Sequence, residues 1–245
     1  MTSMKFSIDK HAQGIRFSVE KKVGKTVVAQ VCLLLDKSGS FQDEYHSGLV
    51  QEVVQHLFPF ALVFDPDQSL DLYTFHTQAK ERPAVTRKNW EGYINRYHLD
   101  SDGDWGGTHY APPLEKALRH YGFIQTHSSG GFLGFGATKT TVVNQNSTDG
   151  HSVLCYLVTD GDNSDENQTE SLIKRCQENG QNIYFMLVGL DNDGKQSFRF
   201  LNYLAKHYDN CGFVSIKNIR QALQDDSFQG LMFQDELVEW LKERK

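Results

Sequence analysis

The sequence predicts an α/β fold in which helices cover both faces of an open, mostly parallel sheet of about six strands. Short apolar runs alternate along the chain with longer segments whose apolar residues recur at helical spacing. Two of these runs, Val31–Leu35 and Val153–Val158, are apolar without interruption, which is typical of central strands buried on both faces. The first run leads directly into Asp36, and the second is separated from Asp160 by Thr159 alone. Alternation of strand and helix is the pattern of a sheet covered on both sides.

The first elements expected are an N-terminal β extension, a central strand and a helix. Phe17-Ser18-Val19-Glu20 alternates as an edge strand does, so residues 1–26 are predicted to form a β extension packed on a domain of residues 27–245. A strand over Val27–Leu35 follows. The next segment, from Tyr45 to Phe60, is predicted to be a helix ended by Pro59, and its apolar stripe is Leu49, Val50, Val53, Val54 and Leu57.

The remaining elements continue the alternation to the C-terminus. Strands are predicted at Leu70–Phe75, Val153–Val158, Ile183–Val188 and Gly212–Ile216. Helices are predicted around Leu114–Tyr121, Leu172–Cys176, Phe198–Ala205 and Leu231–Leu241.

One segment, at about residues 122–150, breaks this alternation. It is dense in Gly, Ser, Thr and Asn, and long loops in compact domains are lids, binding loops or disordered segments. We expect a flexible insertion, with a mobile hairpin or flap favoured over plain disorder. Gly134–Thr140 lacks the residue order of a phosphate-binding loop, and no strand leads into it.

Composition excludes some classes of partner. The chain has 245 residues, a net charge of -6 and a pI near 5.9, which argue against nucleic-acid binding because that requires clustered Lys and Arg. No segment has the roughly 18 apolar residues that indicate a membrane span, and the first 30 residues lack a secretory apolar stretch. The four cysteines form no Cys-x-x-Cys pair and are interpreted as free thiols. We therefore expect a cytoplasmic protein that binds neither nucleic acid nor membrane.

The segment after the first central strand predicts a cation site. Asp36, Ser38 and Ser40 stand at alternate positions, so an extended backbone turns all three toward one point. Mg²⁺ takes about six oxygen ligands and commonly retains water, so three protein oxygens leave the site incomplete. Taken alone, the pattern is equally compatible with an ordinary strand-to-helix turn with Ser40 near the helix start.

Two further segments supply oxygen ligands. Gly106-Gly107-Thr108 precedes a helix that opens with prolines, and Asp160 ends the second central strand. In open α/β sheets, ligands bind beyond the carboxyl ends of the strands where the strand order reverses. We therefore expect Thr108 and Asp160 to join the first three residues if the two central strands are neighbours.

A nearby group of acids, Asp100, Asp102 and Asp104, recurs at every second residue. Its start resembles a calcium loop, but the later glycine and the bidentate glutamate of such a loop are missing. We interpret these acids as turn residues and solvated charge.

In this order, the motifs resemble the metal-ion-dependent adhesion site (MIDAS) of von Willebrand A domains, and most closely those of TerF-type tellurium-resistance proteins. The resemblance runs from about Phe17 to the C-terminus and rests on segments 36–40, 105–112, 158–163, 209–213 and the tail to Lys242. It departs from the family at Phe41, where a methionine is common, and at the insertion. It implies a Rossmann-like von Willebrand A fold and metal ligation by Asp36, Ser38, Ser40, Thr108 and Asp160.

The resemblance further implies a Mg²⁺-dependent protein-interaction module, with Mn²⁺ or Ca²⁺ as alternatives, that acts in stress response. A carboxylate of an acidic partner protein would complete the coordination. We assign four flanking residues to the partner-binding surface: Lys37, Phe41, His109 and Asp162. No base is clearly placed to activate either serine, so we expect no enzyme activity. Two alternatives stay open, a metal-dependent hydrolase or phosphatase acting on a small anionic substrate and a scaffold without a cation.

Overall fold

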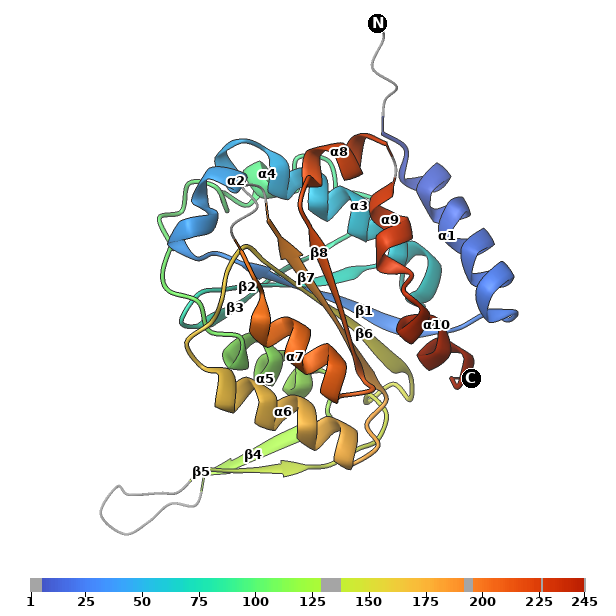
Figure 1. The fold of residues 1–245 in the computed structure, drawn as a ribbon, viewed down its shortest axis with the longest axis vertical. Helices are drawn as coiled ribbons and strands as arrows, with labels where there is room; N and C mark the ends of the chain where they lie inside the picture. Colours follow the sequence, from blue (N-terminus) through green and yellow to red (C-terminus); the bar gives the residue numbers. More distant parts are fainter. Residues whose placement is uncertain (1–5, 129–137, 192–195, 226, 245) are drawn as a thin grey trace, which may run out of the picture.

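A six-stranded sheet lies between two layers of helices (Figure 1) in the computed structural model, which describes residues 6–128, 138–191, 196–225 and 227–244. Its strands, in spatial order, are β3 (Ala79–Val85), β2 (Leu70–Phe75), β1 (Ala29–Asp36), β6 (Ser152–Thr159), β7 (Ile183–Leu190) and β8 (Cys211–Ile216). All neighbours are parallel except β2 and β3. The predicted fold class is confirmed. The antiparallel edge strand β3 was not expected, because its partly exposed sequence contains three charged residues and no apolar run.

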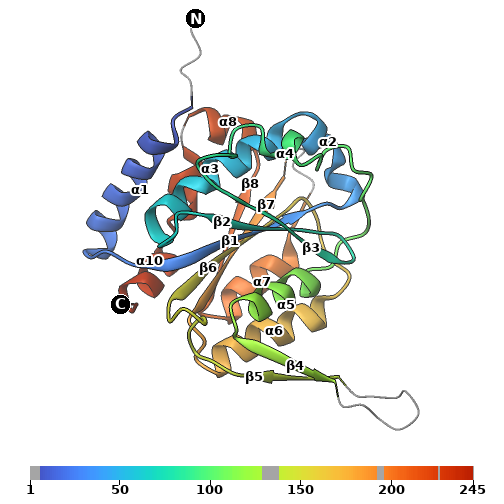
Figure 2. The ribbon, with the colours of Figure 1, turned by 180° about the vertical axis from the view of Figure 1, so that it is seen from behind.

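Helices cover both faces of this sheet, as Figure 2 shows from the reverse side. The first face carries α1 (Ile8–Val23), α3 (Leu49–Phe64), α8 (Ile219–Gln224), α9 (Ser227–Met232) and α10 (Asp235–Lys242). The second carries α5 (Ala111–His120), α6 (Glu166–Glu178) and α7 (Arg199–His207). The short elements η1 (Gly39–Phe41), α2 (Gln42–His46) and α4 (Tyr93–Arg96) lie in connections. Side chains of β1 alternate between the two cores: Val31 and Leu33 face the first, and Cys32 and Leu34 the second.

The predicted N-terminal β extension is wrong, because Ile8–Val23 is the helix α1. Ser7 Oγ accepts a hydrogen bond from Lys10 N at 3.4 Å at its start, and Gly24, with φ of 78°, ends it. The residues that α1 buries recur at helical spacing: Ile8, His11, Ala12, Ile15, Val19 and Val23. Phe17, which suggested a strand, is 66% exposed on the opposite side.

The prediction that Pro59 ends the helix expected from Tyr45 to Phe60 is also wrong. The segment divides at Gly48, with φ of 80°, and α3 then runs through Pro59 to Phe64. An interior proline removes a backbone hydrogen bond and costs about 3 kcal/mol. Most of α3, including Pro59, is buried in the first core, and this packing outweighs the local cost.

The insertion at about 122–150 contains an antiparallel pair, β4 (Ile124–Ser128) and β5 (Thr138–Val142). This agrees with the favoured hairpin, whereas residues 129–137, and with them the expectation of a mobile tip, lie outside the described residues. Gln181 Nε2 donates to Phe123 O at 2.7 Å and to Asn144 O at 2.9 Å just before β7. The base of the hairpin therefore lies at the amino edge of the parallel strands, opposite the edge that carries Asp36.

All four cysteines are buried and unpaired, as the sequence predicts. Within the described ranges, no single helix has the length and apolarity needed to cross a membrane. One bent pair, Gly39–His46 with Leu49–Phe64, meets the length and composition criteria together.

Candidate functional site

The candidate site lies at the carboxyl ends of β1 and β6, which are neighbours at the centre of the sheet. Their register pairs Leu35 with Val158, so Asp36 and Asp160 leave the sheet at the same edge. The chain passes from β1 outward to β2 on one side and later from β6 outward to β7 on the other, so strand order reverses between them. Open α/β sheets bind ligands at such a reversal.

Asp36 has its carboxylate held from both sides in a fully buried position. Oδ1 accepts from Ser38 N at 2.6 Å, and Oδ2 accepts from Thr159 Oγ1 at 2.6 Å. Tyr45 OH donates to the backbone oxygen of Asp36 at 2.8 Å. Burial, together with the nearby Asp160 carboxylate, raises the pKa of Asp36 to about 7 despite the hydrogen bonds from Thr159 and Ser38. A bound cation would favour the charged form of this group.

Ser38, Ser40 and Asp160 form a compact hydrogen-bonded group beside Asp36. The two serine oxygens are 3.0 Å apart, and Asp160 Oδ1 accepts from Ser40 Oγ at 3.0 Å and from Ser38 Oγ at 3.4 Å. Ser38 is buried and Ser40 is exposed. Burial also raises the pKa of Asp160. Four predicted ligands are thus brought together from two strand ends, with one side open to solvent.

The fifth predicted ligand, Thr108, lies on a loop that the backbone ties to the first strand end. Gly39 N donates to Gly106 O at 2.9 Å, and Ser38 and Gly106 form an isolated parallel bridge. A Cβ at Gly106 would lie 2.7 Å from His76 Nδ1, so the close approach requires glycine. Thr108 is half-buried, and in the described part of the chain its hydroxyl makes no hydrogen bond to the other four ligands.

The loop after β6 fixes the other end of this Thr108 segment. Ser164 N donates to Thr108 O at 3.0 Å. Asp165 accepts from Tyr110 N at 2.9 Å and from Ala111 N at 2.8 Å, so its carboxylate caps α5 from a distant segment. Thr108 is therefore held between two loops that both begin at the site.

The assignments of Lys37 and Phe41 to a partner-binding surface are wrong. Lys37 is 0% exposed, and its Nζ donates to Leu99 O and Asp102 Oδ1, each at 2.5 Å, while lying 4.2 Å from the Trp105 ring centroid. Phe41 is fully buried in the first core. Lys37 stands between two ligand positions on an extended backbone, so its side chain faces away from them. Phe41 ends the short helical turn η1 and packs into the first core. His109 is half-buried and Asp162 is exposed, and their contact with a partner remains a prediction.

The acids before the Thr108 loop are also not solvated charge as a group. Asp102 pairs with Lys37 at 2.5 Å and with Arg82 at 3.3 Å. Asp104 pairs with Lys80 at 2.7 Å and with His76 at 3.2 Å. These contacts join the loop to β3 and to the connection after β2, so the acids position the loop.

Three supporting residues were missed from the sequence: Tyr45, Thr159 and Asp165. Thr159 stands directly before Asp160, and its position at a strand end was the available signal. Tyr45 and Asp165 act through contacts between segments far apart in the chain, for which the sequence carries no local signal.

These residues fit a divalent cation. The grouped side chains offer carboxylate and hydroxyl oxygens, the hard ligands preferred by Mg²⁺, Ca²⁺ and Mn²⁺. Lys37, adjacent in sequence, directs its ammonium group to Asp102 instead of to the two acids. The described residues hold no cluster of three or more His, Cys, Asp or Glu suited to a metal, so two carboxylates would supply the charge and hydroxyls the remaining ligands.

Solved structures show similarity in fold. Proximal thread matrix protein 1 from the mussel byssus, described with a zinc-occupied MIDAS motif, matches with a TM-score of 0.53 and 15% identity over 86% of this chain and 48% of the mussel chain. This chain thus spans about half the length of that protein. The manganese-loaded TRAP protein of Plasmodium vivax matches with a TM-score of 0.51 and 12% identity over 81% of this chain and 71% of its own.

Similarity in sequence is more extensive. An uncharacterized protein of Bacillus subtilis (strain 168), YcbR, is 26% identical over 98% of this chain and 88% of its own length. Residues 28–245 match the family described as the von Willebrand A domain found in the TerF C terminus. Together with the six-stranded sheet and the acid and hydroxyl groups at its central edge, this match shows that the chain belongs to the TerF-like von Willebrand A family.

Proposed function

We propose that this protein is a metal-dependent protein-interaction module that acts in the cytoplasm. In the proposal, a divalent cation, with Mg²⁺ as the first candidate, is held by Asp36, Ser38, Ser40, Thr108 and Asp160. Membership of the TerF-like family supports a role in tellurium resistance or a related stress response. Four buried, unpaired thiols are typical of a reducing compartment and support the location.

One observation carries this proposal: two carboxylates and two hydroxyls meet at the edge of the sheet, and the neighbouring ammonium group points elsewhere. Asp160 Oδ1 contacts both serine hydroxyls, while Lys37 Nζ is bound to Leu99 O and Asp102. Both acids accept hydrogen bonds from Ser38, and burial raises the pKa of both carboxyl groups. Such an arrangement is stabilised by a cation.

The proposed partner chemistry is a carboxylate. A bound divalent cation with few charged protein ligands leaves a coordination position that an Asp or Glu of another protein fills. The exposure of Ser40 and Asp162 supports a position that a partner can reach from solvent. Asp162 adds negative charge beside it, so we expect a partner to approach with its acid near the ion and neutral or basic groups opposite Asp162.

Binding is proposed in preference to catalysis because of how the serine hydroxyls are used. Each contacts the other serine and Asp160, and in the described residues neither contacts a histidine. A serine nucleophile needs a base within hydrogen-bond reach.

Thermal unfolding with added Mg²⁺, Mn²⁺ or Ca²⁺ tests the cation site. A cation at 100 times its Kd stabilises the folded state by about 2.7 kcal/mol, and in a domain of this size the melting temperature then rises by about 5–10 °C. Ser40→Ala should abolish most of this rise. Ser47→Ala is the matched control, because Ser47 is an exposed serine directly after α2 that donates to Glu44 O. This variant should keep the rise in melting temperature.

Partner binding is tested with the same two variants. A Glu-containing peptide should bind only with the cation, and only to wild type and Ser47→Ala. Absence of any cation-dependent rise in melting temperature contradicts the proposal. Cation-dependent hydrolysis of a generic phosphate ester that is lost in Ser40→Ala would instead establish the hydrolase alternative.

A further inference from the structure

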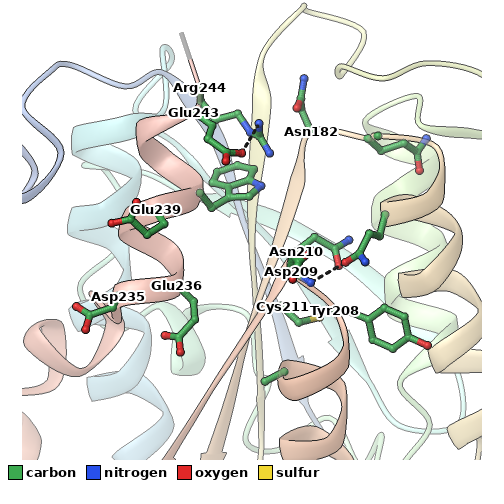
Figure 3. Close-up of a pocket in the computed structure, with 15 residues that line it drawn as sticks. Asn182, Tyr208, Asp209, Asn210, Cys211, Asp235, Glu236, Glu239, Glu243 and Arg244 are labelled. Carbon is green, nitrogen blue, oxygen red and sulfur yellow. Dashed lines mark hydrogen bonds and ion pairs between the residues drawn. The ribbon is translucent and has the colours of Figure 1, made fainter.

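A hollow of about 560 Å³ lies at the opposite edge of the sheet from the candidate cation site. Figure 3 shows the acids of α10 on one side and Asn210 and Tyr208, next to the start of β8, on the other. Gln181 lines the hollow just before β7, at the amino edge of the parallel strands. The eight residues of β7 separate the two edges by ~26 Å at about 3.3 Å per residue.

Negative charge dominates the lining. Asp209, Asp235 and Glu236 are exposed and form no ion pair within the described ranges. Two more acids are partly compensated, because Glu239 pairs with Lys242 at 2.7 Å and Glu243 lies 3.6 Å from Arg244. The hollow therefore carries an excess of carboxylates that favours a cationic occupant.

Two residues that line the hollow, Asn210 and Gln181, carry buried amide side chains. Asn210 is 6% exposed and donates through Nδ2 to Ile173 O at 3.5 Å, and Gln181, 4% exposed, donates through Nε2 to two backbone oxygens. Because backbone carbonyl oxygens only accept hydrogen bonds, the amide nitrogen of each side chain, and not its oxygen, must face these carbonyl groups. Asn210 Oδ1 and Gln181 Oε1 are left without a partner among the described residues. A buried acceptor left unpaired costs about 1–3 kcal/mol, so an occupant with N–H donors would recover that energy.

The ring of Trp240, which lines the hollow, already contacts the guanidinium group of Arg244. The guanidinium carbon of Arg244 lies 4.5 Å from the centroid of the Trp240 ring. Trp240 is buried, and its Nε1 is a further unpartnered polar atom in the lining. The surroundings of this ring thus accept a planar cation in the folded chain.

We infer that this hollow is a binding site for a small organic cation with N–H donors, such as a protonated amine. Carboxylates supply the charge complementarity, the oxygens of Asn210 and Gln181 accept its N–H groups, and Trp240 contributes an aromatic surface. The volume lies within the range of about 300–1,000 Å³ that is usual for small-molecule sites. Binding here requires no divalent cation, because no residue of the candidate metal site lines the hollow.

Calorimetric titration of the full chain with 1,4-diaminobutane in the presence of a chelator tests this inference. We expect saturable binding of one amine with a submillimolar Kd and no binding of the neutral analogue 1,4-butanediol. Asp235→Asn/Glu236→Gln should weaken binding at least tenfold. Glu81→Gln/Glu91→Gln, which removes the same charge at exposed sites elsewhere, should change it less than twofold.

Asp235 and Glu236 stand in the first turn of α10, so their double replacement can also destabilise the fold. A second measurement on the wild-type protein therefore tests binding independently of that variant. In wild type, the diamine should shift the indole N–H resonance of Trp240, assigned with Trp240→Phe, and added salt should weaken binding. No heat and no indole shift at 10 mM diamine would overturn the inference. Equal weakening by both double variants, or equal binding of the diol, would do the same.

Discussion

Replacing Lys37 by Met should both destabilise the domain and weaken cation binding. Lys37 is fully buried, and its ammonium group holds Leu99 O and Asp102 on the segment that leads to the Thr108 loop. Methionine retains most of the side-chain volume beside Trp105 but removes the charge and both hydrogen bonds. The change therefore isolates the polar contribution of Lys37 to loop position.

The expected loss in free energy of unfolding depends on which groups are left unpaired when the ammonium group is removed. Breaking a buried ion pair costs about 3–5 kcal/mol because the remaining charge is left unpaired. Asp102 is 22% exposed and keeps Arg82 at 3.3 Å, so the expected loss is smaller, about 2–3 kcal/mol. The melting temperature should fall by about 4–12 °C.

Urea unfolding of Lys37→Met, Asp102→Asn and the double variant measures this loss and the coupling between the two residues. The single losses should not add, since each variant breaks the same pair. Calorimetry with Mg²⁺ on the folded Lys37→Met protein should show at least fivefold weaker binding than wild type, because the loop that carries Thr108 loses one of its anchors. A loss below 1 kcal/mol, additive single losses, or unchanged Mg²⁺ affinity would refute the assigned role.

Two further outcomes are expected. Asp165→Ala should cost about 2–4 kcal/mol in urea unfolding, because the backbone N–H groups of Tyr110 and Ala111 lose their acceptor; a loss below 1 kcal/mol would contradict the cap. Burial raises the pKa of Asp65 from an ordinary value of 3.8 to about 7. Between these pH values the folded state holds a proton that the unfolded state has released, so the free energy of unfolding falls as pH rises from about 4 to 7. Asp65→Asn should therefore gain stability relative to wild type across that window, and a pH-independent difference would exclude this effect.

The sheet and four of the five proposed ligands were predictable because strong local patterns specify them. Continuous apolar runs followed by acids predicted two central strands. The register of β1 with β6 shows that these strands are neighbours, which was the condition for their acids to converge. The N-terminal helix was missed because Phe17 completes a short alternation while lying outside the helical stripe that packs on the core. The end of α3 was predicted too early, at Pro59, because burial of this helix outweighs the local cost of an interior proline.

The orientation of Lys37 was also predictable from the rule that identified the ligands. If Asp36, Ser38 and Ser40 face one point, the intervening side chains must face away from it. No local rule predicts which group Lys37 contacts, since Asp102 lies far along the chain and meets Lys37 only in the folded protein. The segment 36–40 thus performs two tasks. Asp36, Ser38 and Ser40 line the candidate cation site, and Lys37 anchors the loop that brings Thr108 to it. Loss of the anchor should therefore affect cation affinity although Lys37 touches none of the proposed ligands.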